Sequence, residues 1–134
     1  MNKFYMLMAA CAAMVVATGC ASVQTASEKD MTGMKLTTNP ADQAIAQVNA
    51  DNFGFYLLSI PIFSGSTEKP GTMLFNQDTV TLANVTQMAT AKCKDLGATK
   101  AIDMDSKISS MMIPLPIPFL FYLKEVQVST NAIK

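Results

Sequence analysis

The stretch "LANVTQMATAKCKDLGATKAIDMDSKISS", residues 82–110, decides the fold class, because its pattern changes from a helical period to a strand period. Within residues 82–96, apolar side chains recur every three or four positions and form one narrow stripe on a helix. The stripe consists of Leu82, Val85, Ala89, Cys93 and Leu96. Thr81 or Thr79 is suited to cap the first turn, and Gly97 to end the helix in a left-handed conformation. We therefore predict a helix over 82–96.

Beyond Gly97, apolar and polar residues alternate, which is typical of a strand with one buried face. Ile102, Met104 and Ile108 are expected on one face, and Asp103, Asp105 and Lys107 on the other. The last predicted strand is 119–129, with Leu120, Tyr122, Val126 and Val128 on one face. Lys124 interrupts that face, which favours a bulge or an edge position.

Upstream of the helix, residues 44–63 contain the apolar stretches "AIAQVNA" and "FGFYLLSIPIF". They predict a strand or a hairpin whose turn lies at 49–52, followed by a loop at 64–72. Together these patterns predict a single α+β domain over 34–134, with one helix packed on a small mixed or antiparallel sheet of about four strands.

The segment 111–123 has no charged residue, and prolines alternate through it at Pro114, Pro116 and Pro118. These prolines exclude a helix and remove backbone donors from one edge of a strand. The segment is either an edge or connector that covers the core, an exposed ridge that docks on a partner, or a second membrane contact. The candidate interaction surface comprises Ile113, Leu115, Ile117, Phe119 and Leu120.

The N-terminus, "MNKFYMLMAACAAMVVATGC", has the features of an export signal: Lys3, the apolar run 4–17, and small residues before Cys20. The run is short for a spanning helix, which needs roughly 20 apolar residues. An uncleaved anchor and plain secretion remain the alternatives to a cleaved signal over 1–19.

Thr18, Gly19 and Cys20 resemble the lipobox of bacterial lipoproteins, although Ala17 stands where that family more often has Leu. The resemblance implies a diacylglyceryl group on the Cys20 thiol, cleavage before Cys20, and anchoring by two or three acyl chains. The residue directly after Cys20 is Ala21 and not Asp. Under the sorting rule of enteric bacteria, this implies that the protein is anchored in the outer membrane and faces the periplasm. Residues 20–33 are then expected to be the lipidated N-terminus and a polar tether.

The composition disfavours several classes of function. The chain has ten Lys, ten Asp plus Glu, and no Arg, His or Trp. Without Arg, nucleic-acid binding is disfavoured, and without His, neither a Ser-His-Asp relay nor an imidazole metal site can form. We therefore expect no enzyme and no cofactor.

Three smaller groups of residues have plain structural interpretations. Asp78, Asp103 and Asp105 lack the Gly and terminal Glu of a calcium loop and are expected to be solvated. Methionines are spread through the whole chain, which favours gap-filling over a copper site. Cys93 is expected to be buried on the helix.

The segments "FGFYLLSIPIFSG", residues 53–65, and "LGATK", residues 96–100, resemble a group of small bacterial lipoproteins for which no activity is established. The resemblance implies fold and location only. The expected function is a non-catalytic structural or protein-interaction role at the envelope, with a membrane anchor at Cys20 and an envelope protein as partner. The alternative is a periplasmic ligand-binding or stress-sensing module.

Overall fold

The computed structural model describes residues 20–37, 39, 41–114 and 118–134. Within them, one α-helix packs on a six-stranded antiparallel sheet, so the α+β class is confirmed. The strands are β1 (Ala21–Ala26), β2 (Ala44–Leu57), β3 (Ile60–Gly65), β4 (Met73–Phe75), β5 (Lys100–Ile113) and β6 (Phe121–Ile133). The helices are the 3-10 turn η1 (Glu28–Met31) and α2 (Leu82–Asp95). The sheet is larger than the four strands expected.

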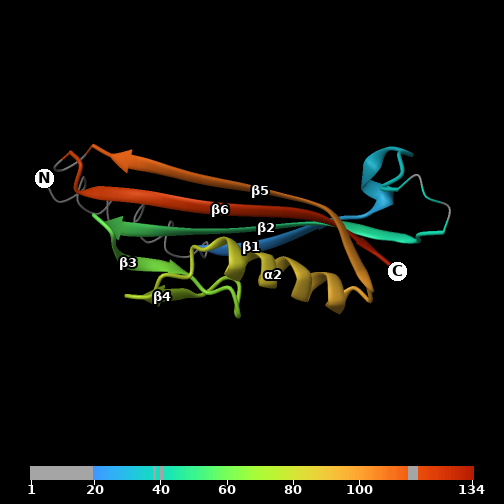
Figure 1. Cartoon of the computed structure of the whole chain (residues 1–134), viewed down its shortest axis with the longest axis horizontal. Helices are drawn as coiled ribbons and strands as arrows, with labels where there is room; N and C mark the ends of the chain where they lie inside the picture. The colour runs from blue at the N-terminus through green and yellow to red at the C-terminus, as the bar shows by residue number, and fades with distance from the viewer. Residues whose placement is uncertain (1–19, 38, 40, 115–117) are drawn as a thin grey trace, which may run out of the picture.

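The strand order is β4-β3-β2-β6-β5, with β1 as an additional partner of β2 (Figure 1). Since β2 is 14 residues long, one of its edges holds two short strands in succession. β1 pairs with residues 47–52 of β2, and β3 pairs with residues 54–57. Along the other edge, β6 pairs with β2 over its whole length.

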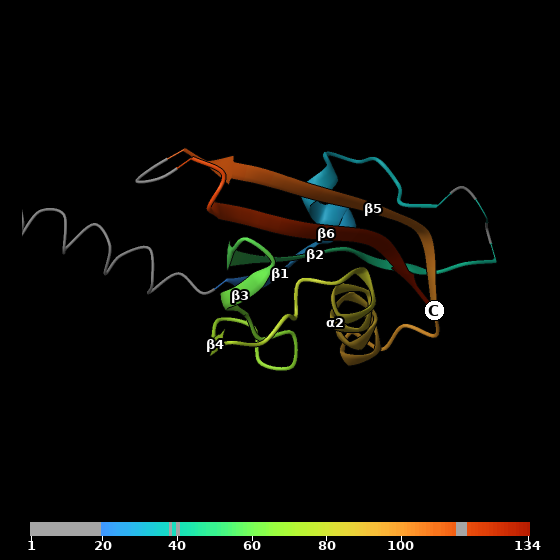
Figure 2. The same cartoon turned by 60° about the vertical axis from the view of Figure 1, so that its left-hand side comes forward.

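Helix α2 lies on one face of the sheet, against β2 and β6 (Figures 1 and 2). The predicted helix is confirmed to within one residue: Thr81 accepts a hydrogen bond from the backbone N–H of Asn84 (3.3 Å). The core between helix and sheet consists of Val85, Met88, Ala89, Cys93, Ala21, Val48, Ala50, Tyr56, Val80, Val126, Val128 and Ala132. The expected burial of Cys93 is confirmed.

Residues 20–33, expected to be a tether, belong in part to the fold. Ala21–Ala26 forms β1, and Ala21 is buried in the core. A polar strand without an apolar period is stabilised here because β2 offers its free edge, so the expectation of an unpaired tether is wrong for this segment.

The turn expected at 49–52 is also wrong, because β2 runs straight through it. Asn52 is fully buried, and its amide donates to the carbonyls of Gly65 (3.2 Å) and Thr79 (3.0 Å). These tertiary bonds satisfy the NH2 group of a side chain that sequence rules assign to turns. The hairpin turn instead consists of Leu58 and Ser59.

Strand β5 does not keep the alternation expected of it. Asp103 has a left-handed φ of 51°, and the register shifts between Ile102 and Asp105. After this bulge, Ile108 pairs with Val126 on the α2 face, while Ile102 pairs with Asn131 on the other. The predicted shared face of Ile102, Met104 and Ile108 is therefore wrong.

Lys124 creates neither a bulge nor an edge, since β6 lies between β2 and β5 in continuous register at Gly54–Lys124. Its ammonium lies 4.3 Å from the centre of the Tyr56 ring. A cation over an aromatic face is a favourable contact, so the lysine is accommodated within the sheet. Tyr122, Val126 and Val128 share the α2 face as predicted.

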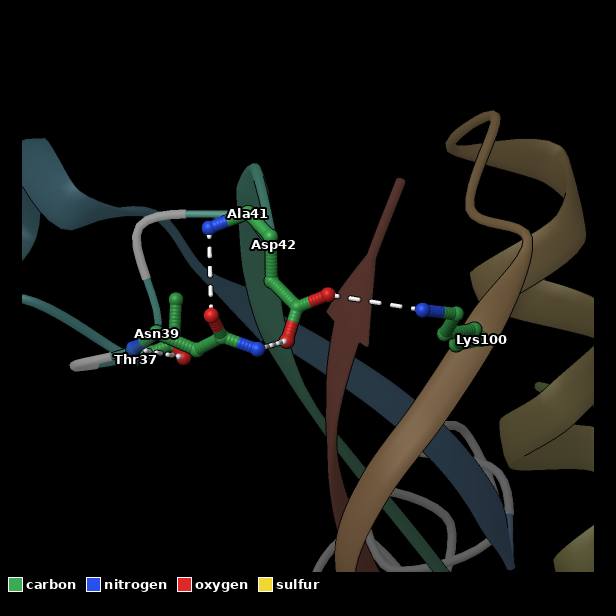
Figure 3. Close-up of polar contacts among 5 residues, drawn as sticks. All are labelled: Thr37, Asn39, Ala41, Asp42 and Lys100. Atoms are coloured by element: carbon green, nitrogen blue, oxygen red, sulfur yellow. Dashed lines mark hydrogen bonds and ion pairs between the residues drawn. The ribbon is translucent and has the colours of Figure 1, made fainter.

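The segment before β2 is held by a polar network (Figure 3). Asn39 donates to Asp42 (2.9 Å) and accepts from the N–H of Ala41 (3.1 Å), while Lys100 contacts Asp42 at 3.4 Å. This network joins the segment to the start of β5. It lies at the opposite end of the sheet from the β5–β6 turn (Figure 1).

Candidate functional site

Cys20 lies at the point where β1 and β3 meet on the edge of β2. The backbone N–H of Phe53, the residue between the two paired segments, donates to the Cys20 carbonyl (2.8 Å). The N–H of Gly71 donates to the carbonyl of Ala21 (3.0 Å). Cys20, the residue directly before β1, is therefore held in place by the sheet.

Gly65 allows this junction to close. A Cβ at this position would overlap the Cys20 and Ala21 backbone and the side-chain oxygen of Asn52. That Asn52 oxygen is buried and has no hydrogen-bond partner within the described part of the chain. The junction therefore has no room for a larger residue at 65.

Cys20 is 3% exposed in the full-length chain, and burial raises the pKa of its thiol. Burial likewise raises the pKa of the Cys93 thiol on α2. Since the thiolate is the nucleophile, neither thiol is activated as a catalytic cysteine requires.

The face of the sheet opposite α2, here called the open face, carries two rows of apolar side chains. Directly paired residues of antiparallel strands share a face, so the register defines each row. The first row is Ile113, Phe121, Leu57 and Ile60; the second is Met111, Leu123, Phe55, Phe63 and Phe75. The Phe55 ring stacks on those of Phe63 (5.4 Å) and Phe121 (5.3 Å).

Two hairpin turns extend these rows. Leu58 lies in the β2–β3 turn and Phe119 in the β5–β6 turn, and they are 56% and 67% exposed. A bond from the Leu58 N–H to the Leu120 carbonyl (2.7 Å) joins the two turns. The two apolar rows with Leu58 and Phe119 are named the apolar end.

The open face becomes polar within two further rows. The third row holds Ser109, Glu125 and Phe53, with Cys20 opposite Phe53. The fourth row is Lys107, Gln127, Asp51 and Ser22. Ser109 and Gln127 both donate to the Glu125 carboxylate, at 3.2 and 2.8 Å. Cys20 therefore lies at the boundary between apolar and polar surface.

The candidate interaction surface predicted from the sequence is brought together only in part. Ile113 belongs to the first apolar row, Phe119 is exposed in its turn, and Leu120 is half-buried behind it. Leu115 and Ile117 lie outside the described residues. The predicted interaction surface did not include Phe53, Phe55 and Phe63, although the period of two in "NFGFYL" was a usable signal.

The acidic residues do not converge. Among the residues described, no group of three potential Asp, Glu or Cys ligands could hold a metal ion. Asp103 accepts from Asn131 (3.1 Å), and Asp105 from the N–H of Ser106 (2.8 Å). Asp78 accepts from the Tyr56 hydroxyl (2.6 Å). Burial and then this bond raise the pKa of Tyr56 well above its usual value.

A polar cleft of about 370 Å³ lies between the 66–72 loop and the first turns of α2. Hydroxyl and amide side chains dominate its lining: Ser66, Thr67, Thr72, Gln77, Thr79, Asn84 and Gln87. Glu68, Lys69 and Leu74 complete it. The hydroxyl and amide groups suit a neutral polar ligand.

No helix among the described residues is long and apolar enough to cross a membrane. The chain matches no family model, no curated protein and no solved structure.

Proposed function

We propose that the chain is a bacterial lipoprotein, anchored through Cys20 to the outer membrane and facing the periplasm, with a non-catalytic structural or protein-interaction role. One observation carries the proposal: the lipobox-like cysteine directly precedes the first strand of the domain. Cleavage before Cys20 would leave every strand and helix described above in the mature protein.

The chemistry of the chain supports a non-catalytic role. The sequence offers no His or Arg, and both described thiols have raised pKa values. The apolar end supports an interaction role, because large contiguous apolar patches are uncommon on monomers and it gathers the exposed residues Leu58, Ile60, Phe75, Met111 and Phe119.

Cys20→Ala tests the anchor, and Cys93→Ala is the matched control because both residues are small and buried. Cells are labelled with a clickable palmitate analogue, and membrane and soluble fractions are compared. The wild type and Cys93→Ala should be labelled and sediment with membranes, whereas Cys20→Ala should lose the label. Label retained by Cys20→Ala would contradict the proposal.

The polar cleft favours a second candidate function, a periplasmic ligand-binding module for a neutral polar molecule such as a glycan. A soluble peptidoglycan fragment should raise the melting temperature of the wild type but not of Gln87→Leu, which replaces a lining amide. Gln127→Leu, on the open face, is the control and should respond like the wild type. Equal responses in all three proteins would exclude the cleft.

A further inference from the structure

The lipid attachment proposed above and the apolar end belong to the same region of the sheet. Cys20 lies opposite Phe53, and β1 begins at the next residue. No linker therefore separates the acyl chains from the domain. Successive rows of a strand face are about 7 Å apart, so the second apolar row begins about one row from the anchored residue.

Charge is absent from the two hairpins that supply the whole apolar end except Phe75 of β4. Neither residues 52–67 nor residues 108–123 include a charged side chain, although charges are frequent in the neighbouring segments. A surface that enters lipid must exclude charge, because a charged side chain is costly in the apolar part of the bilayer. A protein interface usually has a polar rim on every side.

Both hairpin turns place a large apolar residue where the backbone disfavours it. Leu58 and Phe119 have left-handed φ values of 56° and 66°. Gly and Asn adopt this conformation more easily than Leu or Phe do, and neither exposes a large apolar side chain to water. Leu58 and Phe119 gain little from burial there, because more than half of each residue is exposed. Such choices are typical of positions with a function.

We propose that the apolar end is a second membrane contact, which lies on the same lipid surface that holds the acyl chains of Cys20. The proposal rests on the proposed lipidation. The side chains of the two apolar rows, Leu58 and Phe119 enter the headgroup and upper acyl region, and the fourth row stays in water. The domain is thereby held in one orientation with the polar cleft and α2 turned away from the bilayer.

The contact is shallow and made mainly by side chains. β4, β5 and β1 each have a free edge, and unpaired edge groups are not tolerated in hydrocarbon. Docking of the open face at the depth of an interfacial helix, about 5–10 Å, buries the apolar rows and leaves these edges near water.

Single tryptophans test the proposal, because the chain has no Trp of its own. Phe119→Trp and Ile60→Trp place the probe on the apolar end, and Gln127→Trp places it on the fourth row of the same face. Each full-length variant is expressed in bacteria, purified from membranes and reconstituted in phosphatidylethanolamine–phosphatidylglycerol vesicles with brominated acyl chains. Its mass reports whether Cys20 carries lipid.

The expected result is quenching at positions 119 and 60 at least about twofold stronger than at position 127, as the difference in depth requires. Equal quenching at all three positions on a lipidated protein would overturn the membrane contact and leave the anchor intact. A probe shielded from both bromine and aqueous iodide at position 119 would also overturn it, because a protein surface, such as a second copy, would then cover the apolar end. An unmodified Cys20 would overturn the proposed function and this proposal together.

Discussion

Gly65 determines how closely β1 and β3 can approach each other on the edge of β2. Gly65→Ala would force the Cβ against the Cys20 and Ala21 backbone, which cannot rotate away as a side chain could. We expect a loss of about 1–3 kcal/mol in the free energy of unfolding, as for other overpacked sites. Urea unfolding measures it.

Hydrogen exchange makes this test specific to the junction. The Phe53 amide, bonded to the Cys20 carbonyl, should exchange faster in Gly65→Ala. Gly33→Ala is the control, because Gly33 has a positive φ but no atom near its added Cβ. Gly33→Ala should leave the exchange of the Phe53 amide as slow as in the wild type. Equal exchange rates of this amide in the two variants would contradict the role assigned to Gly65.

The raised pKa of Tyr56 predicts that the free energy of unfolding falls at alkaline pH. Burial and the Asp78 bond raise its folded-state pKa, so the folded protein keeps a proton that an unfolded tyrosine loses near pH 10. Its contribution is complete below that pH and is lost as pH rises from about 10 toward the folded pKa. Tyr56→Phe should be less stable at pH 8 but should decline less steeply above about pH 10. Parallel curves for the two proteins in urea unfolding would contradict this.

At the scale of elements, α2 shows what sequence patterns predict well. Its apolar stripe and its Thr81 cap are both local; the structure contains the cap and buries Val85, Ala89 and Cys93 of the stripe, while Leu82 is exposed. Thr81→Ala should lower the free energy of unfolding by about 1 kcal/mol, because the Asn84 N–H loses its acceptor. Thr90→Ala should be neutral within about 0.5 kcal/mol, since Thr90 bonds only within its own helix. Chemical unfolding of the two variants measures both free energies and so compares the loss of an N-cap with a substitution inside the helix.

Elements that depend on distant partners were not predictable in the same way. Nothing local indicates that Ala21–Ala26 is a strand; it forms because β3 is too short to occupy the whole edge of β2. By residue type, Asn52 is expected in a turn. Its place within β2 depends on the carbonyls of Gly65 and Thr79, which accept its hydrogen bonds and are distant in the sequence. The apolar rows likewise depend on the register of four strand pairs, of which the sequence shows only the period within each strand.

The β2–β3 turn allows stability and membrane contact to be separated. Leu58→Asn should raise the free energy of unfolding by about 0.5–1 kcal/mol, because Asn tolerates the left-handed conformation at this position. It should also weaken bromine quenching of a tryptophan at position 60. Ser59→Asn, at the neighbouring turn position, should change neither quantity. A destabilised Leu58→Asn would show that Leu58 is held by packing within the domain.

At the scale of the whole molecule, the distribution of charge distinguishes a hydrophobic contact from an electrostatic one. The full chain has formal net charge +0, and loss of residues 1–19 removes one lysine, Lys3, and no acid. Basic patches bind anionic lipid through a field that falls off within a Debye length, about 10 Å at 0.1 M salt. The apolar end has no charge through which such a field could act.

Its contact with the bilayer should therefore be independent of salt and of lipid charge. Quenching of the Phe119→Trp probe by brominated lipid should stay constant between about 0.05 and 0.5 M NaCl, although the Debye length falls severalfold over that range. Replacement of phosphatidylglycerol by phosphatidylcholine should leave it unchanged as well. Quenching that weakens with salt would assign the orientation to Lys107 on the fourth row of the open face instead. Constant quenching would show that the apolar rows alone hold the sheet against the membrane, because burial of apolar area does not depend on ionic screening.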